Sequence, residues 1–176
     1  MPLKPAVFID RDDTLLQDEG YMTRPEQVRL FPGTLDALLT FQEAGLTLVL
    51  VSNQSGVGRG WFSQGEVRAI QERMLELLPG VEFAALEYCF HMPEDGCPCR
   101  KPQPLMILRA AHRLGIDLSR SVMVGDRISD VGAGRSAGCK TLLLSADEEL
   151  IKEAGPDHAV ASLADGVEWV LEVTRG

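Results

Sequence analysis

The segment AVFIDRDDT, residues 6–14, joins a short apolar run to two aspartates that are spaced two residues apart. The run lies between Pro5 and an acidic loop that follows Leu16, which is typical of a buried parallel strand. Asp10 and Asp12 then lie at its carboxyl end, and residues i and i+2 of an extended chain project to the same side. One carboxylate is therefore placed to attack an electrophile, and the other to protonate a leaving oxygen. A solvated acidic turn is the alternative interpretation.

Strand and helix patterns alternate along the rest of the chain. Apolar runs rich in β-branched residues predict strands over 6–9, 46–51, 86–90, 122–124, 141–144 and 159–160. Apolar residues at three- and four-residue spacing predict helices over 35–44, 64–78, 105–114, 130–137, 147–154 and 164–173. This alternation predicts an α/β fold, a Rossmann-like three-layer sandwich with a central parallel sheet. No domain-sized insertion interrupts the pattern, so we expect one domain over 1–176 without a separate cap domain.

Composition narrows the class of protein. The 176 residues are 45% hydrophobic and 24% charged, which suits one domain with a sizeable core. The net charge of -9 argues against a nucleic-acid or membrane-surface binder, because either would need a basic face. No segment approaches 18 apolar residues, and the N-terminal apolar run is too short for a signal peptide. We therefore expect a cytoplasmic monomer that binds a small molecule.

Polar residues follow three of the predicted strands. Asp10 follows the first, the segment SNQSG at 52–56 closes the second, and Asp126 follows the fourth. Ligands of open parallel sheets bind beyond the carboxyl ends of the strands. Taken singly, Ser52 and Asn53 also fit turn or capping roles, and Asp126 fits a helix N-cap. Their occurrence at three strand ends predicts a shared site.

Carboxylates at one sheet edge predict a bound cation. Asp10, Asp12 and Asp126 would repel one another without a cation between them. Mg²⁺ is the usual ion where carboxylates and a substrate phosphate share the coordination sphere with water. Asp130 either holds Lys101 or a metal-bound water, or is an ordinary acid in the first turn of a helix.

Four segments together resemble a known family. DRDDT, SNQSG, the lysine of CRKP, and GDRISD resemble, in this order, the four motifs of haloacid dehalogenase-superfamily phosphatases. The resemblance spans residues 10–130 and implies the fold of that superfamily. It also implies that Asp10 is a nucleophile that forms an aspartyl-phosphate. Asp12 would protonate the leaving alkoxide and then act as base for the attacking water.

The same resemblance implies the remaining catalytic groups. Ser52 and Lys101 would hold phosphoryl oxygens. Mg²⁺ would be bound by the carboxylates of Asp10 and Asp126 with the backbone carbonyl of Asp12. These roles agree with the chemistry, since phosphoryl transfer mainly needs in-line positioning and neutralisation of charge.

A second cluster of potential ligands lies within eleven residues, and it consists of Cys89, His91, Cys97 and Cys99. A Cys3His set is typical of a closed structural zinc site. Incidental thiols beside a loop histidine are the alternative, and a redox pair fits less well because no Cys-x-x-Cys is present. Zinc would pin the loop at 89–99, which runs directly into Arg100 and Lys101, and would so shape the substrate wall.

The zinc-loop pattern narrows the resemblance to a group that contains heptose bisphosphate phosphatases and histidinol-phosphate phosphatases. The segments DEGY at 18–21, VGRG at 57–60 and KPQP at 101–104 resemble the heptose branch. This implies removal of the 7-phosphate of D-glycero-D-manno-heptose 1,7-bisphosphate, with histidinol phosphate or another small sugar phosphate as alternatives. An inactive zinc-stabilised binding module, a receiver-like phospho-acceptor and a nucleic-acid 3′-phosphatase are the competing classes.

Short loops must provide specificity in a site without a cap. The expected substrate-binding residues are Asp18, Glu19, Gly20, Tyr21, Asn53, Gln54, Ser55, Arg59, Arg100 and Arg127. The planar fork of Arg100 can take two oxygens of a second anionic group, although it also fits a solvated surface arginine.

Two positions depart from the family pattern. Asp13 and Leu105 stand where the family usually has glycine, which often marks a backbone that strains other residues. Aspartate tolerates the left-handed conformation better than most. We expect Asp13 to face solvent or the water shell of the metal and to slow turnover without abolishing it.

Overall fold

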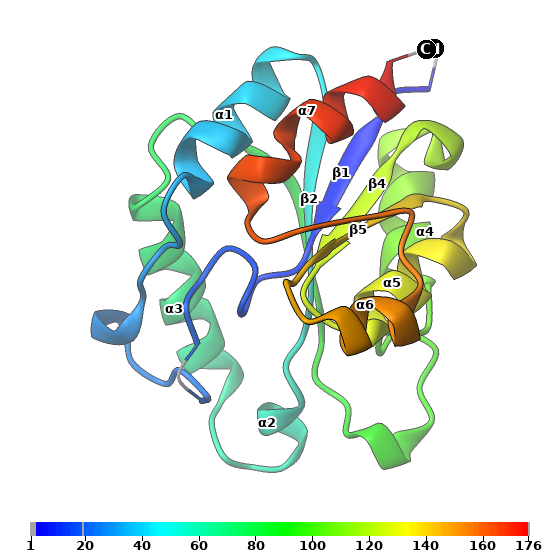
Figure 1. The fold of residues 1–176 in the computed structure, drawn as a ribbon. Helices are drawn as coiled ribbons and strands as arrows, with labels where there is room; N and C mark the ends of the chain where they lie inside the picture. Colours follow the sequence, from blue (N-terminus) through cyan, green and yellow to red (C-terminus); the bar gives the residue numbers. More distant parts are fainter. Residues whose placement is uncertain (1–2, 19, 176) are drawn as a thin grey trace.

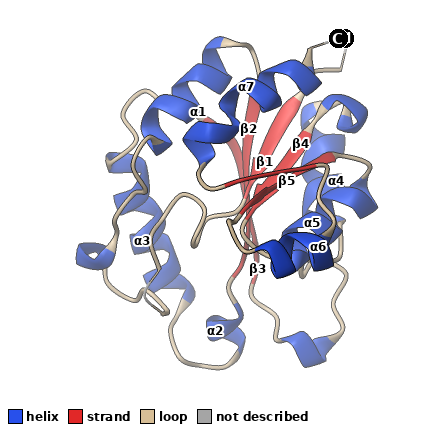
Figure 2. Cartoon of the chain, in the orientation of Figure 1, coloured by secondary structure: helices blue, strands red, loops and turns tan. Residues whose placement is uncertain are grey.

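The computed structural model describes residues 3–18 and 20–175, in which a parallel sheet lies between two layers of helices (Figures 1 and 2). The strand order is β3-β2-β1-β4-β5-β6. The strands are β1 (Ala6–Ile9), β2 (Thr47–Asn53), β3 (Phe83–Cys89), β4 (Val122–Gly125), β5 (Lys140–Leu144) and β6 (His158–Val160). The helices are α1 (Thr34–Glu43), α2 (Ser55–Gly58), α3 (Gln64–Glu76), α4 (Leu105–Leu114), α5 (Ile128–Ala137), α6 (Glu148–Ala154) and α7 (Leu163–Thr174). Short 3-10 turns are η1 (Pro25–Gln27), η2 (Pro93–Asp95) and η3 (Leu118–Arg120).

β1 lies in the middle of the sheet and is buried on both faces. Val7 and Ile9 pack in the core beneath α1, α3 and α7, while Ala6 and Phe8 pack in the core beneath α4 and α5. Successive side chains of a strand point to opposite faces, so a strand covered on both sides must be apolar throughout. This is why residues 6–9 read as an unbroken apolar run. The prediction of a three-layer α/β sandwich is confirmed.

The largest difference from the predicted strands is at β3. This strand begins at Phe83, earlier than the predicted range 86–90. β3 is an edge strand whose burial alternates along its length, and residues 83–86 include two alanines, which are not β-branched and have a low strand propensity. The helix α2 was not predicted, because four residues are too few to show a helical period. Helix α3 begins with a reciprocal capping box, in which the Ser63 side chain accepts from the Glu66 N–H and the Glu66 side chain accepts from the Ser63 N–H.

The strand order places one crevice at the centre of the sheet. β1 pairs with β2 on one side and with β4 on the other, so the chain changes direction across the sheet at β1. Ligands bind at such switch points. Among the described residues, the chain between β1 and β4 forms the strands β2 and β3, the helices α1 to α4 and the three 3-10 turns. The absence of a separate cap domain stays a prediction.

No helix in the described ranges has both the length and the apolar character that crossing a membrane requires.

Candidate active site

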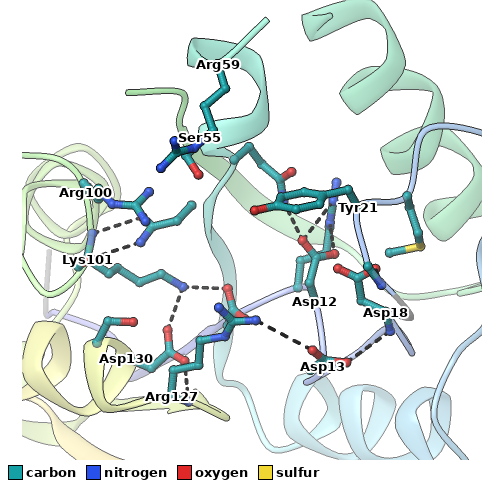
Figure 3. A pocket seen from close by; sticks show the side chains of 17 residues that line it. Asp12, Asp13, Asp18, Tyr21, Ser55, Arg59, Arg100, Lys101, Arg127 and Asp130 are labelled. Atoms are coloured by element: carbon teal, nitrogen blue, oxygen red, sulfur yellow. Dashed lines mark hydrogen bonds and ion pairs between the residues drawn. The ribbon is translucent and has the colours of Figure 1, made fainter. Parts of the chain in front are cut away.

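Four segments of the chain line one cavity of about 410 Å³ at the carboxyl ends of the strands (Figure 3). Asp10 directly follows β1, and its backbone N–H donates to the carbonyl of Val124 in β4 at 3.0 Å. Asp12, Lys101 and Asp130 line the same cavity. Of the residues predicted at strand ends, Asp10 and Asn53 therefore line this cavity, whereas Ser52 and Asp126 are not among its lining residues.

The ammonium of Lys101 is the buried centre of this cavity. Its Nζ lies 2.6 Å from Asp10 Oδ1, 2.7 Å from Asp130 Oδ1 and 2.8 Å from the Val51 carbonyl oxygen. These three contacts match the three donors of an ammonium. Burial lowers the pKa of Lys101, but the carboxylates of Asp10 and Asp130 outweigh it and the net shift is upward. The lysine therefore stays charged beside Asp10.

Asp130 serves two of the roles that the sequence left open. Its carboxylate binds Lys101, and its second oxygen accepts a hydrogen bond from the backbone N–H of Arg127 at 3.0 Å, at the start of α5. The acid reaches this position because Gly125 has no side chain. A Cβ at Gly125 would lie 2.2 Å from the Asp130 carboxyl. Gly125 thus leaves room for the Asp130 carboxylate that binds Lys101.

Three carboxylates gather beside the lysine, and one oxygen from each of Asp10, Asp126 and Asp130 lies within 4.8 Å of the others. Burial raises the pKa of Asp10 to about 8. The ammonium of Lys101 opposes this shift, and the carboxylates of Asp130 and Asp12 add to it. Burial and then Asp130 raise the pKa of Asp126 to about 6. A hard cation would allow all three carboxylates to ionise, so the donor set fits Mg²⁺.

The carboxylate of Asp12 is bound from two sides. Arg11 donates to both of its oxygens, from Nε at 2.8 Å and from a terminal nitrogen at 3.1 Å. Gln54 donates to Asp12 Oδ2 at 2.6 Å. The role of Asp12 as acid and base, and the binding of its backbone carbonyl to a metal, stay predictions. Nothing in the spacing of the two aspartates indicated that Arg11 would turn back toward Asp12.

Residues of the SNQSG segment mainly hold other parts of the site. Ser52 is buried, and its Oγ accepts a hydrogen bond from Gln54 Nε2 at 2.9 Å. The amide of Asn53 binds the backbone of Lys101 at both ends, with Nδ2 donating to the carbonyl at 3.1 Å and Oδ1 accepting from the N–H at 3.0 Å. Asn53, Gln54 and Ser55 line the cavity as expected. Substrate binding by these residues stays a prediction.

Asp13 adopts the left-handed conformation that the family's glycine suggests, with φ at 57°. Its side chain does more than face solvent. Oδ1 accepts a hydrogen bond from the Asp18 backbone at 3.1 Å, and Oδ2 lies 3.8 Å from Arg127. Leu105 is the first residue of α4 and is partly exposed, in a conformation that any residue adopts. Asp13, but not Leu105, therefore has a backbone conformation that glycine adopts most easily.

The loop after the nucleophile forms one wall of the cavity, through Asp18, Gly20 and Tyr21. Glu19 lies outside the described residues. Tyr21 packs edge-on against Trp61, with ring centroids 4.8 Å apart. The guanidinium of Arg59 lies 5.2 Å from the Trp61 ring. The sequence analysis did not predict a role for Trp61, an exposed residue five positions after the SNQSG segment.

Cations surround the mouth of the cavity, and the arginines concerned are Arg59, Arg100 and Arg127 (Figure 3). Arg127 lies 3.6 Å from Asp126. One terminal nitrogen of Arg100 is buried and has no hydrogen-bond partner among the described residues. A buried guanidinium nitrogen without a partner costs free energy, which an anionic ligand would recover.

The predicted zinc ligands converge at the end of β3. The Sγ atoms of Cys89, Cys97 and Cys99 lie 3.2–3.6 Å apart, and His91 Nδ1 lies 3.3 Å from the Cys99 sulfur and 3.5 Å from that of Cys89. Tetrahedral zinc–sulfur bonds of about 2.3 Å separate two sulfurs by about 3.8 Å, so these spacings fit a single ion. The backbone N–H of Gln54 donates to the Cys89 carbonyl at 2.7 Å. The cluster is thereby tied to the active-site loop.

Comparison with known proteins gives consistent results. A family model described as HAD-hydrolase-like matches residues 98–166. The D-glycero-β-D-manno-heptose-1,7-bisphosphate 7-phosphatase of Pasteurella multocida is 38% identical over 174 residues, which cover 93% of this chain and 95% of that protein. The corresponding 7-phosphatase of Thermosynechococcus vestitus is 36% identical over 187 residues and covers 95% of each.

A solved structure is similar over almost the whole chain. The D,D-heptose 1,7-bisphosphate phosphatase from B. bronchiseptica, crystallised with magnesium and phosphate, has a TM-score of 0.87 and 32% sequence identity. The match covers 96% of this chain and 98% of that one. The chain therefore belongs to the haloacid dehalogenase-like hydrolases, in the family of the heptose bisphosphate phosphatases that it matches.

Proposed function

We propose that this protein removes the 7-phosphate of D-glycero-D-manno-heptose 1,7-bisphosphate through an aspartyl-phosphate at Asp10. One observation carries the reaction type, namely the buried ammonium of Lys101 between Asp10 and Asp130 in an open cavity. A cation held there neutralises the oxygens of a phosphoryl group on Asp10. The named activity of the relatives from Pasteurella multocida and Thermosynechococcus vestitus supports the substrate.

The chain supplies the groups for two in-line displacements. In the first, Asp10 attacks phosphorus, the bond to the leaving oxygen breaks, and Asp12 gives that oxygen a proton. In the second, water attacks phosphorus, Asp12 takes a proton from the water, and the bond to Asp10 breaks. Ser52 and Lys101 hold phosphoryl oxygens. A Mg²⁺ ion held by Asp10, Asp126 and the Asp12 carbonyl would supply further charge neutralisation.

The mouth of the cavity supports a substrate with two phosphates. Arg100 lines the cavity and has a buried nitrogen without a partner, so a second phosphate would satisfy it. Tyr21 and Arg59 line the same rim and are proposed to contact the sugar, together with the other loop residues predicted above. Substrate specificity thus comes from the loops that carry Tyr21, Arg59 and Arg100.

We further propose that residues 1–176 form one catalytic domain that works as a cytoplasmic monomer. The net charge of -9 argues against a nucleic-acid partner.

Substrate preference is tested by phosphate release with Mg²⁺, comparing the heptose bisphosphate with histidinol phosphate and a panel of sugar and nucleoside phosphates. We expect kcat/KM for the heptose bisphosphate to exceed the others by 10²-fold or more, about 2.7 kcal/mol of differential transition-state binding. Asp10→Asn should lose all turnover and serves as the blank. Equal rates across the panel would refute the heptose assignment. Rates no higher than the blank would favour an inactive binding module.

Binding of Mg²⁺ should strengthen as pH rises, because protons and the cation compete for the same carboxylates. With pKa values of about 6 for Asp126 and about 8 for Asp10, both acids hold protons at low pH and release them across this window. Affinity should rise about tenfold per unit between pH 6 and 8, where one proton is displaced, and more steeply below pH 6. Calorimetric titration measures this, with the exposed Asp36→Asn as control. An affinity that is constant from pH 6 to 8 would contradict the coupling.

We also propose that Cys89, His91, Cys97 and Cys99 hold a structural zinc ion. Cys99→Ala should remove the zinc measured by elemental analysis and lower Tm by more than about 5 °C, because metal binding is coupled to local folding. The matched control is Cys139→Ala, a buried thiol outside the cluster, which should keep the metal and shift Tm by about 2–4 °C at most. Purified protein without zinc, or equal effects of the two substitutions, would count against the site.

A further inference from the structure

The carboxylate of Asp12 has a hydrogen-bond pattern that distinguishes its two oxygens. Oδ2 accepts from a terminal nitrogen of Arg11 at 3.1 Å and from Gln54 Nε2 at 2.6 Å. Oδ1 accepts from Arg11 Nε at 2.8 Å. A carboxylate offers about four lone-pair sites, two on each oxygen. Among the described residues, both sites on Oδ2 are thus occupied, while Oδ1 keeps one site.

Arg11 is an unusual residue to find buried. Its side chain is 2% exposed, and it is the largest of the fully buried side chains. Asp12 is its ion-pair partner, and its remaining terminal nitrogen has no hydrogen-bond partner among the described residues. Charged groups are costly to bury unless they are paired. The Tyr88 hydroxyl of β3 also interacts with this guanidinium, so Asp12 is its carboxylate partner but not its only polar neighbour among the described residues.

A purely structural purpose fits this ion pair poorly. Arg11 and Asp12 are adjacent in the sequence, so the pair does not join distant elements of the fold. Gln54 makes the long-range connection, since it comes from the end of β2 and also donates to Ser52. The three side chains thus connect the acid of the first strand end with the phosphate-binding serine of the second.

We propose that Arg11 and Gln54 are positioning residues that fix the Asp12 carboxylate so that its Oδ1 alone exchanges the proton of catalysis. This inference rests on the function proposed above. In the first displacement the proton leaves Oδ1 for the leaving oxygen as the bond from phosphorus to that oxygen breaks. In the second, Oδ1 takes a proton from water as water bonds to phosphorus and the bond to Asp10 breaks. A single fixed oxygen serves both, because leaving group and water occupy the same in-line position.

The test separates the two displacements by the choice of leaving group. An aryl phosphate such as p-nitrophenyl phosphate leaves without help from an acid, whereas a sugar phosphate needs the proton. Arg11→Met should therefore phosphorylate Asp10 at nearly the parental rate with the aryl phosphate. Hydrolysis of the aspartyl-phosphate should slow about a hundredfold, so that the phosphorylated fraction rises in acid-quenched samples analysed by mass spectrometry. With the aryl phosphate, kcat and KM should therefore fall together, and kcat/KM, which reports the phosphorylation step, should stay within about threefold of the parental value.

Further variants keep the inference falsifiable if Arg11→Met folds poorly. Arg11→Lys should restore part of the rate, and Gln54→Leu should show the same accumulation to a smaller extent. The matched control is Arg109→Met, which removes an arginine from a pair with the buried Glu87 outside the cavity and should leave the phosphorylated fraction unchanged. Variants with parental kinetics, or a lower Tm with equal slowing of both displacements, would overturn the inference. A parent enzyme that is never phosphorylated would instead refute the proposed function.

Discussion

The buried contact of Lys101 with Asp10 and Asp130 is the interaction on which the rest of the site depends. It joins the loop after β3 to the end of β1 and the start of α5, and the Val51 carbonyl of β2 completes it. An ammonium at this depth must be paired, because removing one carboxylate would leave a buried charge uncompensated. The sheet order makes the pairing possible, since it brings the ends of β1, β2 and β4 together. The same buried contact of Lys101 thus constrains both the packing of these segments and the chemistry of the site.

Asn53 and the cysteine cluster explain how Lys101 is held in place. The Asn53 amide binds the backbone of Lys101 as a neighbouring strand would, and the Gln54 N–H binds Cys89. Cys99 lies only two residues before the lysine. A metal bound to the cysteines would therefore restrict the backbone that positions Lys101. The proposed zinc would then support the proposed reaction without contact with the substrate.

Much of the site was predictable because strand ends are readable in the sequence. Asp10, Ser52 and Asp126 follow apolar runs, and parallel sheets bring such ends together. The cysteine cluster could be predicted from the close spacing of its four potential ligands in the sequence. The partners of Arg11, Asn53 and Gln54 were not, because they depend on side-chain directions that only the packed loops determine. The same limit applies to Trp61, whose contact with Tyr21 joins two loops distant in the sequence.

Trapping of the phosphorylated enzyme tests most directly whether Asp10, beside Lys101, is the nucleophile. The protein would be mixed with substrate and Mg²⁺, reduced with borohydride to convert an acyl phosphate to the alcohol, digested and analysed by peptide mass spectrometry. The reduced residue should lie at position 10, only when substrate is present, and be absent from Asp10→Asn. Turnover with reduction at Asp12 or Asp126, or with no reduced residue, would contradict the assignment.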